Sequence, residues 1–244
     1  MSICSASPGP DIRVIAGHFS SPLVRVLLGL TVVTGVVDAV SFLFLGRVFV
    51  ANMTGNVVFI GFAVAGAPGL SAWVCLTALA GFALGSIAGG RLARAFGPER
   101  RRWLMLAMTG ETALVGIVLL LSRAGGLHAS GGLGRYLAAL ILAAAMGVQN
   151  ATARALAVPD LTTTVLTLTL TGLSADSTFG SGKRIPPWRR IASVSAMLAG
   201  ALVGAALVLH VSATAAIGLA TGALAVIALA TSLLSSDRLG EAAA

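Results

Sequence analysis

Long apolar stretches separated by short polar ones organise this chain along nearly its whole length. Eight such stretches can be recognised in the sequence. A helix needs about 20 predominantly apolar residues to cross a bilayer, so six of the eight predict transmembrane helices. The expected fold is therefore all-α, a polytopic membrane helix bundle. The stretches are 23–45, 48–65, 73–96, 103–122, 136–157, 161–175, 191–210 and 213–234.

Two of the stretches are poorer spans. The second carries two amides and a hydroxyl near its beginning, and the sixth is short and rich in threonine. We therefore predict six full spans and two re-entrant or half-spanning helices, with eight full spans as the alternative. The residues that interrupt these two stretches include Asn52, Thr54, Gly55, Asn56, Thr163, Thr164 and Thr167.

The basic residues favour the first alternative. Two clusters stand out, at 91–102 and 176–190, and such clusters mark cytoplasmic loops. Eight full spans would place the clusters on opposite sides of the membrane. Six spans with two half-spans place both clusters, and both termini, in the cytoplasm.

The two halves of the chain also resemble each other, over about 23–122 and 136–234. Gly35 and Asp38 match Gly147 and Asn150, and a glycine pair recurs in each half: Gly81 and Gly85, then Gly200 and Gly204. This indicates an internal duplication within a single membrane domain, 23–234, between polar tails at 1–22 and 235–244. Three crossings in each half would make the repeats inverted, a pattern typical of secondary transporters with a midplane site.

Composition agrees with a membrane protein. The chain is 57% hydrophobic and 10% charged, far below the charge of a soluble domain. Its net charge of +8 lies in short clusters between apolar runs, so we predict lipid contact and no nucleic-acid partner. The two cysteines and three histidines are scattered, which predicts no metal and no cofactor. The sequence contains no catalytic motif and no phosphate-binding loop, so we do not expect the protein to be an enzyme.

Two acids fall inside predicted spans. Asp38 lies about two thirds along the first span and Glu111 near the middle of the fourth. A carboxyl group is costly there and is a functional candidate by default, so both are proton-coupling candidates. The structural alternatives are that Asp38 caps a neighbouring helix end or pairs with Arg47 or Arg154, and that Glu111 only packs in its protonated form.

A second polar cluster lies on the fifth span, where Asn150 and Arg154 share a helix face next to Gln149. If the second stretch is a half-helix, its N–H groups favour an anion or polar ligand. Ordinary capping and interhelical hydrogen bonds are the alternatives. The predicted substrate-binding residues are Asp38, Asn52, Thr54, Gly55, Asn56, Gln149, Asn150, Arg154, Thr163, Thr164 and Thr167.

The run Phe-Val-Ala-Asn-Met-Thr-Gly-Asn at 49–56 resembles the signature of the YoaK-like family. So does Met-Gly-Val-Gln-Asn-Ala at 146–151, followed by Arg154. The resemblance implies a multi-pass protein of the bacterial cytoplasmic (inner) membrane and no established substrate. One departure is that Leu168, rather than glycine, follows Thr167.

Two functions fit the sequence. The first is a secondary transporter or permease for a small polar or anionic solute, which the paired polar breaks and intramembrane acids favour. The second is a non-transporting scaffold or assembly factor. The glycine rows indicate close helix packing and a possible homo-oligomer.

Overall fold

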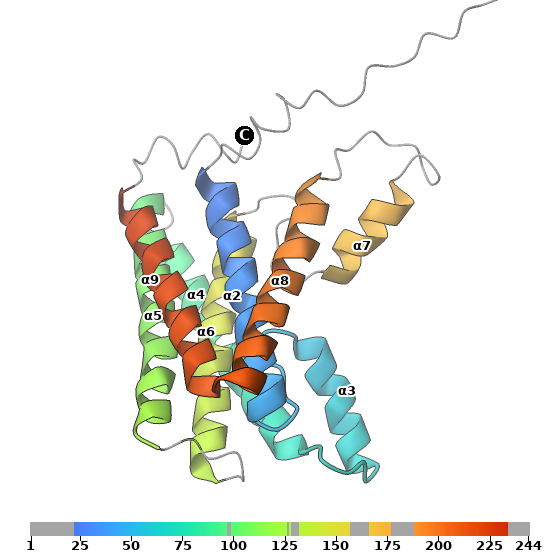
Figure 1. Cartoon of the computed structure of the whole chain (residues 1–244). Helices are drawn as coiled ribbons and strands as arrows, with labels where there is room; N and C mark the ends of the chain where they lie inside the picture. The colour runs from blue at the N-terminus through green and yellow to red at the C-terminus, as the bar shows by residue number, and fades with distance from the viewer. Residues whose placement is uncertain are drawn as a thin grey trace, which may run out of the picture.

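A computed structural model of the chain describes residues 22–96, 99–125, 127, 132–156, 166–176 and 188–233 (Figure 1). Six helices in these residues are long and apolar enough to cross a membrane, so the predicted all-α membrane bundle is confirmed. These are α2 (Pro22–Phe44), α4 (Ala72–Phe96), α5 (Arg100–Arg123), α6 (Leu133–Leu156), α8 (Trp188–His210) and α9 (Ala213–Leu233).

The two weaker stretches form short helices, also as predicted. They are α3 (Met53–Val64), with 12 residues, and α7 (Leu166–Ala175), with 10. Helix α3 begins five residues after the start of the apolar stretch that predicted it. The residues before it turn back from the end of α2, because Gly46 and Arg47 have positive φ values of 96° and 56°.

The helices run in alternate directions through the bundle (Figure 1). Helices α2, α5 and α8 run one way, and α4, α6 and α9 run the other. The start of α2 and the end of α9 therefore lie at the same end of the bundle. Helix α3 begins about midway between the two ends, at the edge of the bundle, and runs toward the end opposite the start of α2. Helix α7 runs toward the end that holds the start of α2.

Two parallel helix pairs form the closest contacts, and glycine makes both possible. A Cβ atom added to Gly89 of α4 would lie 2.8 Å from the Cβ of Ala151 in α6. One added to Gly204 of α8 would lie 2.8 Å from the Cα of Val36 in α2. Both glycine rows are therefore buried within one chain, as small residues at close crossings are. They do not offer a surface to a second copy.

The remaining contacts complete the bundle. Helices α5 and α9 pack antiparallel, and Ser122 and Thr214 share a hydrogen bond between them. Helix α5 also contacts α6, and α2 contacts α9. The short helices lie at the edge, α3 against α4 and α7 against α8. This arrangement places the beginning of α3 beside α2, where the first group of predicted site residues lies.

Candidate functional site

Asp38 holds the chain that leads into α3. Its side chain is 5% exposed, and its Oδ1 accepts hydrogen bonds from the main-chain N–H groups of Val50 (3.0 Å) and Ala51 (2.9 Å). Asp38 is six residues from the end of α2, which at 1.5 Å per residue is about 9 Å inside the span. The carboxylate therefore satisfies non-helical backbone within the membrane, where such groups must find partners in the protein.

Asn56 forms a second clamp on the same segment. Its side chain is fully buried; its Oδ1 accepts from the N–H of Phe49 at 2.9 Å, and its Nδ2 donates to the carbonyl of Phe49 at 2.6 Å. The side-chain amide of Asn56 thus binds both the N–H and the carbonyl group of Phe49. The first turn of α3 is tied to the chain that precedes it.

Gly55 makes room for the Phe49 ring. A Cβ atom on Gly55 would lie 2.8 Å from Cδ2 of Phe49, so a larger residue would displace the ring. The ring forms a three-ring cluster with Phe42 of α2 and Phe59 of α3, stacking on each with centroid distances of 5.1 and 5.7 Å. The close approach predicted at Gly55 is therefore made by an aromatic side chain of the protein itself.

Asn52 and Thr54 have a different environment. Both are exposed, and Asn52, at the N-cap of α3, makes no capping hydrogen bond through its side chain. The signature at 49–56 thus divides into two groups. Phe49, Gly55 and Asn56 build the half-helix, while Asn52 and Thr54 present polar groups at its N-terminal end.

Gln149 joins the second cluster to the first. Its Nε2 donates to Oγ1 of Thr34 at 2.7 Å, linking α6 to α2, and both side chains are fully buried. Thr34 lies one helical turn before Asp38 on the same face of α2. Oε1 of Gln149 and the hydroxyl of Thr152, one turn further along α6, are buried and have no partner in the described structure.

The rest of the second cluster is less buried. Asn150 is partly buried and donates to the carbonyl of Met146 at 2.8 Å. Arg154 and Thr167 are exposed, and the carbonyl of Thr167 accepts from the hydroxyl of Thr171. Thr163 and Thr164 lie outside the described residues. Within the described residues, Gln149 is the member of this group whose side chain is seen bonded to α2.

Glu111 lies in the middle of α5 and is fully buried. Neither carboxylate oxygen has a hydrogen-bond partner in the part of the chain that the structure describes. Buried polar atoms are usually paired, so an unpaired carboxyl inside a span needs a reason beyond packing. Within the described residues no hydrogen bond joins Glu111 to Asp38 or Gln149, so Glu111 is a separate polar position. Among the described residues no three His, Cys, Asp or Glu side chains gather as metal ligands would.

Three residues that matter here were not among the predicted site residues. Thr34 and Thr152 stand in apolar runs, where a threonine usually bonds to its own helix. Thr34 does so, to the carbonyl of Leu30 at 2.9 Å, and also accepts from Gln149. Phe49 contributes through its main chain and ring. The sequence did contain one indication of the two threonines, which is their spacing from predicted site residues. Thr34 is four residues before Asp38 and Thr152 is three residues after Gln149, so each shares a helix face with its neighbour.

Comparison with known proteins agrees with this architecture. The family described as "Protein of unknown function (DUF1275)" matches residues 26–230, from the second turn of α2 to the last turn of α9. Over 151 residues the chain is 32% identical to the UPF0700 transmembrane protein YoaK of Bacillus subtilis (strain 168). That alignment covers 62% of this chain and 65% of the relative's length. No solved structure matches the chain. Since the match extends from the first of these six spans to the last, the chain is an integral membrane protein and belongs to the DUF1275 family.

Proposed function

We propose that this protein is a permease or secondary transporter for a small polar solute. One observation carries the proposal: two buried polar side chains of α6, one of them bonded to α2, have atoms with no hydrogen-bond partner among the described residues. These are Oε1 of Gln149, whose Nε2 is bonded to Thr34 one turn from Asp38, and the hydroxyl of Thr152, one turn further along α6. Intramembrane polar groups are costly, and they mark substrate pathways more often than they serve packing alone.

The chemistry of these groups favours a solute that donates hydrogen bonds. An amide oxygen and a carboxylate only accept, and a hydroxyl does both. Asp38 also places a carboxylate at the segment that begins α3, so a negative group already faces this half-helix. A neutral solute with hydroxyl or amide groups, or a cation, therefore fits this interior better than an anion.

The contact pattern supports two related halves. We infer that α2–α5 and α6–α9 are inverted copies, because the two parallel pairs repeat each other residue by residue. Gly89 contacts Val148 and Ala151 as Gly204 contacts Val36 and Ala39. The shift is 112 residues between α2 and α6 and 115 between α4 and α8. On this basis Gly85 and Gly89, rather than Gly81 and Gly85, correspond to Gly200 and Gly204.

The distribution of arginine supports one orientation of the bundle in the membrane. One end of the bundle holds Arg25, Arg91, Arg94, Arg101, Arg102, Arg154, Arg189 and Arg190, whereas the other end holds Arg47, Arg123 and Arg135. The positive-inside rule places the first end in the cytoplasm, together with the start of α2 and the end of α9. The similarity to a transmembrane protein of Bacillus subtilis supports a bacterial cytoplasmic membrane as the location.

A flux screen tests the proposal against the scaffold alternative. Purified protein is reconstituted into liposomes, and entry of neutral polar solutes is followed by stopped-flow light scattering after an osmotic step. Charged solutes are screened by current on a solid-supported membrane. We expect a subset of solutes, all hydrogen-bond donors, to enter faster than into empty liposomes. A scaffold would leave every rate at the level of empty liposomes, and selective entry of anions would reject the proposed solute class.

A further inference from the structure

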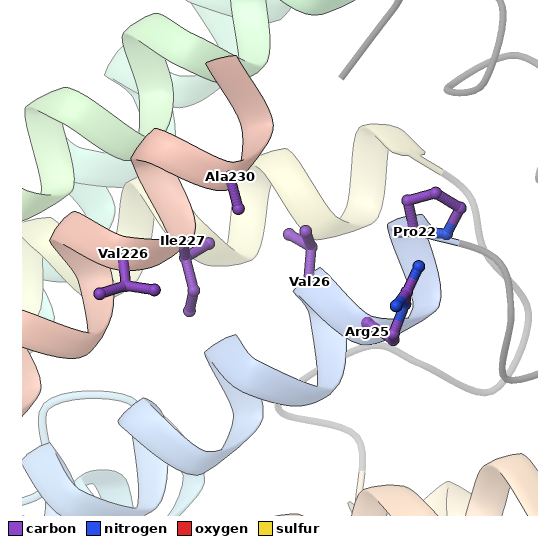
Figure 2. A pocket seen from close by; sticks show the side chains of 6 residues that line it. All are labelled: Pro22, Arg25, Val26, Val226, Ile227 and Ala230. Atoms are coloured by element: carbon purple, nitrogen blue, oxygen red, sulfur yellow. The ribbon is translucent and has the colours of Figure 1, made fainter. Parts of the chain in front are cut away.

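A groove separate from the polar interior opens between the first turns of α2 and the last turns of α9 (Figure 2). It encloses a volume of about 300 Å³. Its walls are formed mainly by Val26, Val226, Ile227 and Ala230, and Arg25 lies at the end beside Pro22. On one side the groove is closed where the side chain of Ile227 packs on Gly29. The groove is therefore apolar along its walls and cationic at its outer end.

The position of the groove in the bundle fits a lipid better than a soluble ligand. Pro22 and Val26 both line the groove and are four residues apart, so the groove descends about 6 Å along α2 from the start of the helix. Val226 is 67% exposed, which leaves the groove open toward the surface that faces lipid. An apolar channel that begins at the membrane surface accepts the first segment of an acyl chain, with the headgroup held at its mouth.

The charge around the mouth selects the headgroup. Arg101 donates to the carbonyl of Ser232, which brings a second guanidinium to the end of α9. The described acids at this end of the bundle, Glu99 and Asp176, are each paired with an arginine, at 3.4 and 3.0 Å. Among the described residues, arginine therefore outnumbers acid at this end of the bundle. A guanidinium has five N–H donors, so Arg25 and Arg101 can each bind a phosphate oxygen while keeping bonds within the protein.

We propose that this groove binds one anionic phospholipid, with its phosphate at Arg25 and Arg101 and an acyl chain between Val26 and Ile227. Basic pockets between transmembrane helices bind acidic headgroups in this way. The site does not depend on whether the protein transports a solute. Bound lipid would bridge α2 and α9, the first and last helices that the structure describes, and would stabilise their contact.

The test uses the full-length protein, delipidated in a neutral detergent, and its melting temperature with added lipid. Dioleoylphosphatidylglycerol should raise the melting temperature more than dioleoylphosphatidylcholine, and the difference should shrink at high salt. Arg25→Gln should weaken apparent affinity for the anionic lipid about fivefold, since a basic residue at the surface contributes about 1 kcal/mol. Arg25→Lys should retain most of the selectivity.

Two further variants separate the groove from general charge effects. Ala230→Leu places a larger side chain in the exposed groove wall and should weaken binding of the anionic lipid with little change in the lipid-free melting temperature. Arg123→Gln removes an exposed charge at the opposite end and should leave binding unchanged. Equal effects of the two lipids would overturn the proposal, as would equal losses in Arg25→Gln and Arg123→Gln. So would an equal shift with glycerol phosphate, because the acyl chain would then contribute nothing.

Discussion

The carboxylate of Asp38 accepts a 2.9 Å hydrogen bond from the main-chain N–H of Ala51, inside the first transmembrane span. The bond joins a full span to the chain that leads into a half-helix. It also explains why an acid is tolerated at this depth, since non-helical backbone within a membrane must be satisfied by protein. Asp38 therefore has an architectural role, whatever further role it has in solute passage.

Substitutions at Asp38 separate these two roles. Asp38→Ala leaves the buried N–H groups of Val50 and Ala51 without an acceptor, at a cost of about 1–3 kcal/mol for each group. Asp38→Asn keeps an acceptor oxygen and should lose less stability. Thermal unfolding can be followed by a thiol-reactive dye at the buried Cys75, in a background with Cys4→Ser. Equal melting temperatures for the alanine variant and wild type would show that the carboxylate does not hold this segment.

The close α4–α6 crossing predicts a sharp contrast between two glycines of α4. A Cβ at Gly85 would collide with the carbonyl oxygen of Ala144, whereas nothing lies within 4 Å at Gly90. Gly85→Ala should therefore destabilise the protein by about 1–3 kcal/mol or more through overpacking. Gly90→Ala should be neutral or slightly stabilising, because alanine is the better helix former by about 1 kcal/mol. The same unfolding measurement checks both, and similar effects would contradict the close crossing.

The bond between Gln149 and Thr34 predicts energetic coupling between α2 and α6. A double-mutant cycle with Gln149→Leu and Thr34→Val should give a coupling energy of about 0.6 kcal/mol, the average for interhelical hydrogen bonds in membranes, and at most about 1.7 kcal/mol. The measurement is unfolding in mixed micelles of sodium dodecyl sulfate and a mild detergent. Strictly additive effects would mean that the two side chains do not interact.

The six-span topology predicts opposite labelling of two exposed alanines near the two ends of α4. In a background without Cys4 and Cys75, Ala95→Cys should be protected from a membrane-impermeant maleimide in intact cells. Ala65→Cys, at the end of α3, should react readily, because the positive-inside rule places that end outside. Disruption of the cells should expose Ala95→Cys as a control. The reverse pattern would invert the orientation.

Much of the fold could be predicted from the sequence because bilayer thickness fixes helix length. The six long stretches became six spans, and the polar breaks marked both short helices. The glycine row of α4 indicated a close crossing, but not that α6 would be its partner. Pairing depends on contacts far apart in the chain, which the local pattern does not encode.

The candidate site was less predictable, for a physical reason. The burial of Asp38 follows from the cost of a carboxylate in lipid, but its partners are main-chain groups of Val50 and Ala51, which have apolar side chains. Almost any residue type can form a hydrogen bond through its main-chain atoms, so the sequence does not show which residues do so. Asn52 and Asn56 are the same residue type within one short run, yet Asn52 is exposed and Asn56 binds the main chain of Phe49. Only the turn of the chain before α3 distinguishes them.

Solute flux through the Asp38→Asn variant tests the central claim most directly. That claim is that the buried polar groups of α2 and α6, near the start of α3, serve a permeating solute. The initial rate is measured in proteoliposomes at equal amounts of folded protein, with the best solute from the screen. We predict a rate at least about tenfold below wild type, equivalent to about 1.4 kcal/mol, with the melting temperature largely retained. Wild-type flux in this variant would contradict the account, and so would the absence of flux for every solute in the wild-type protein.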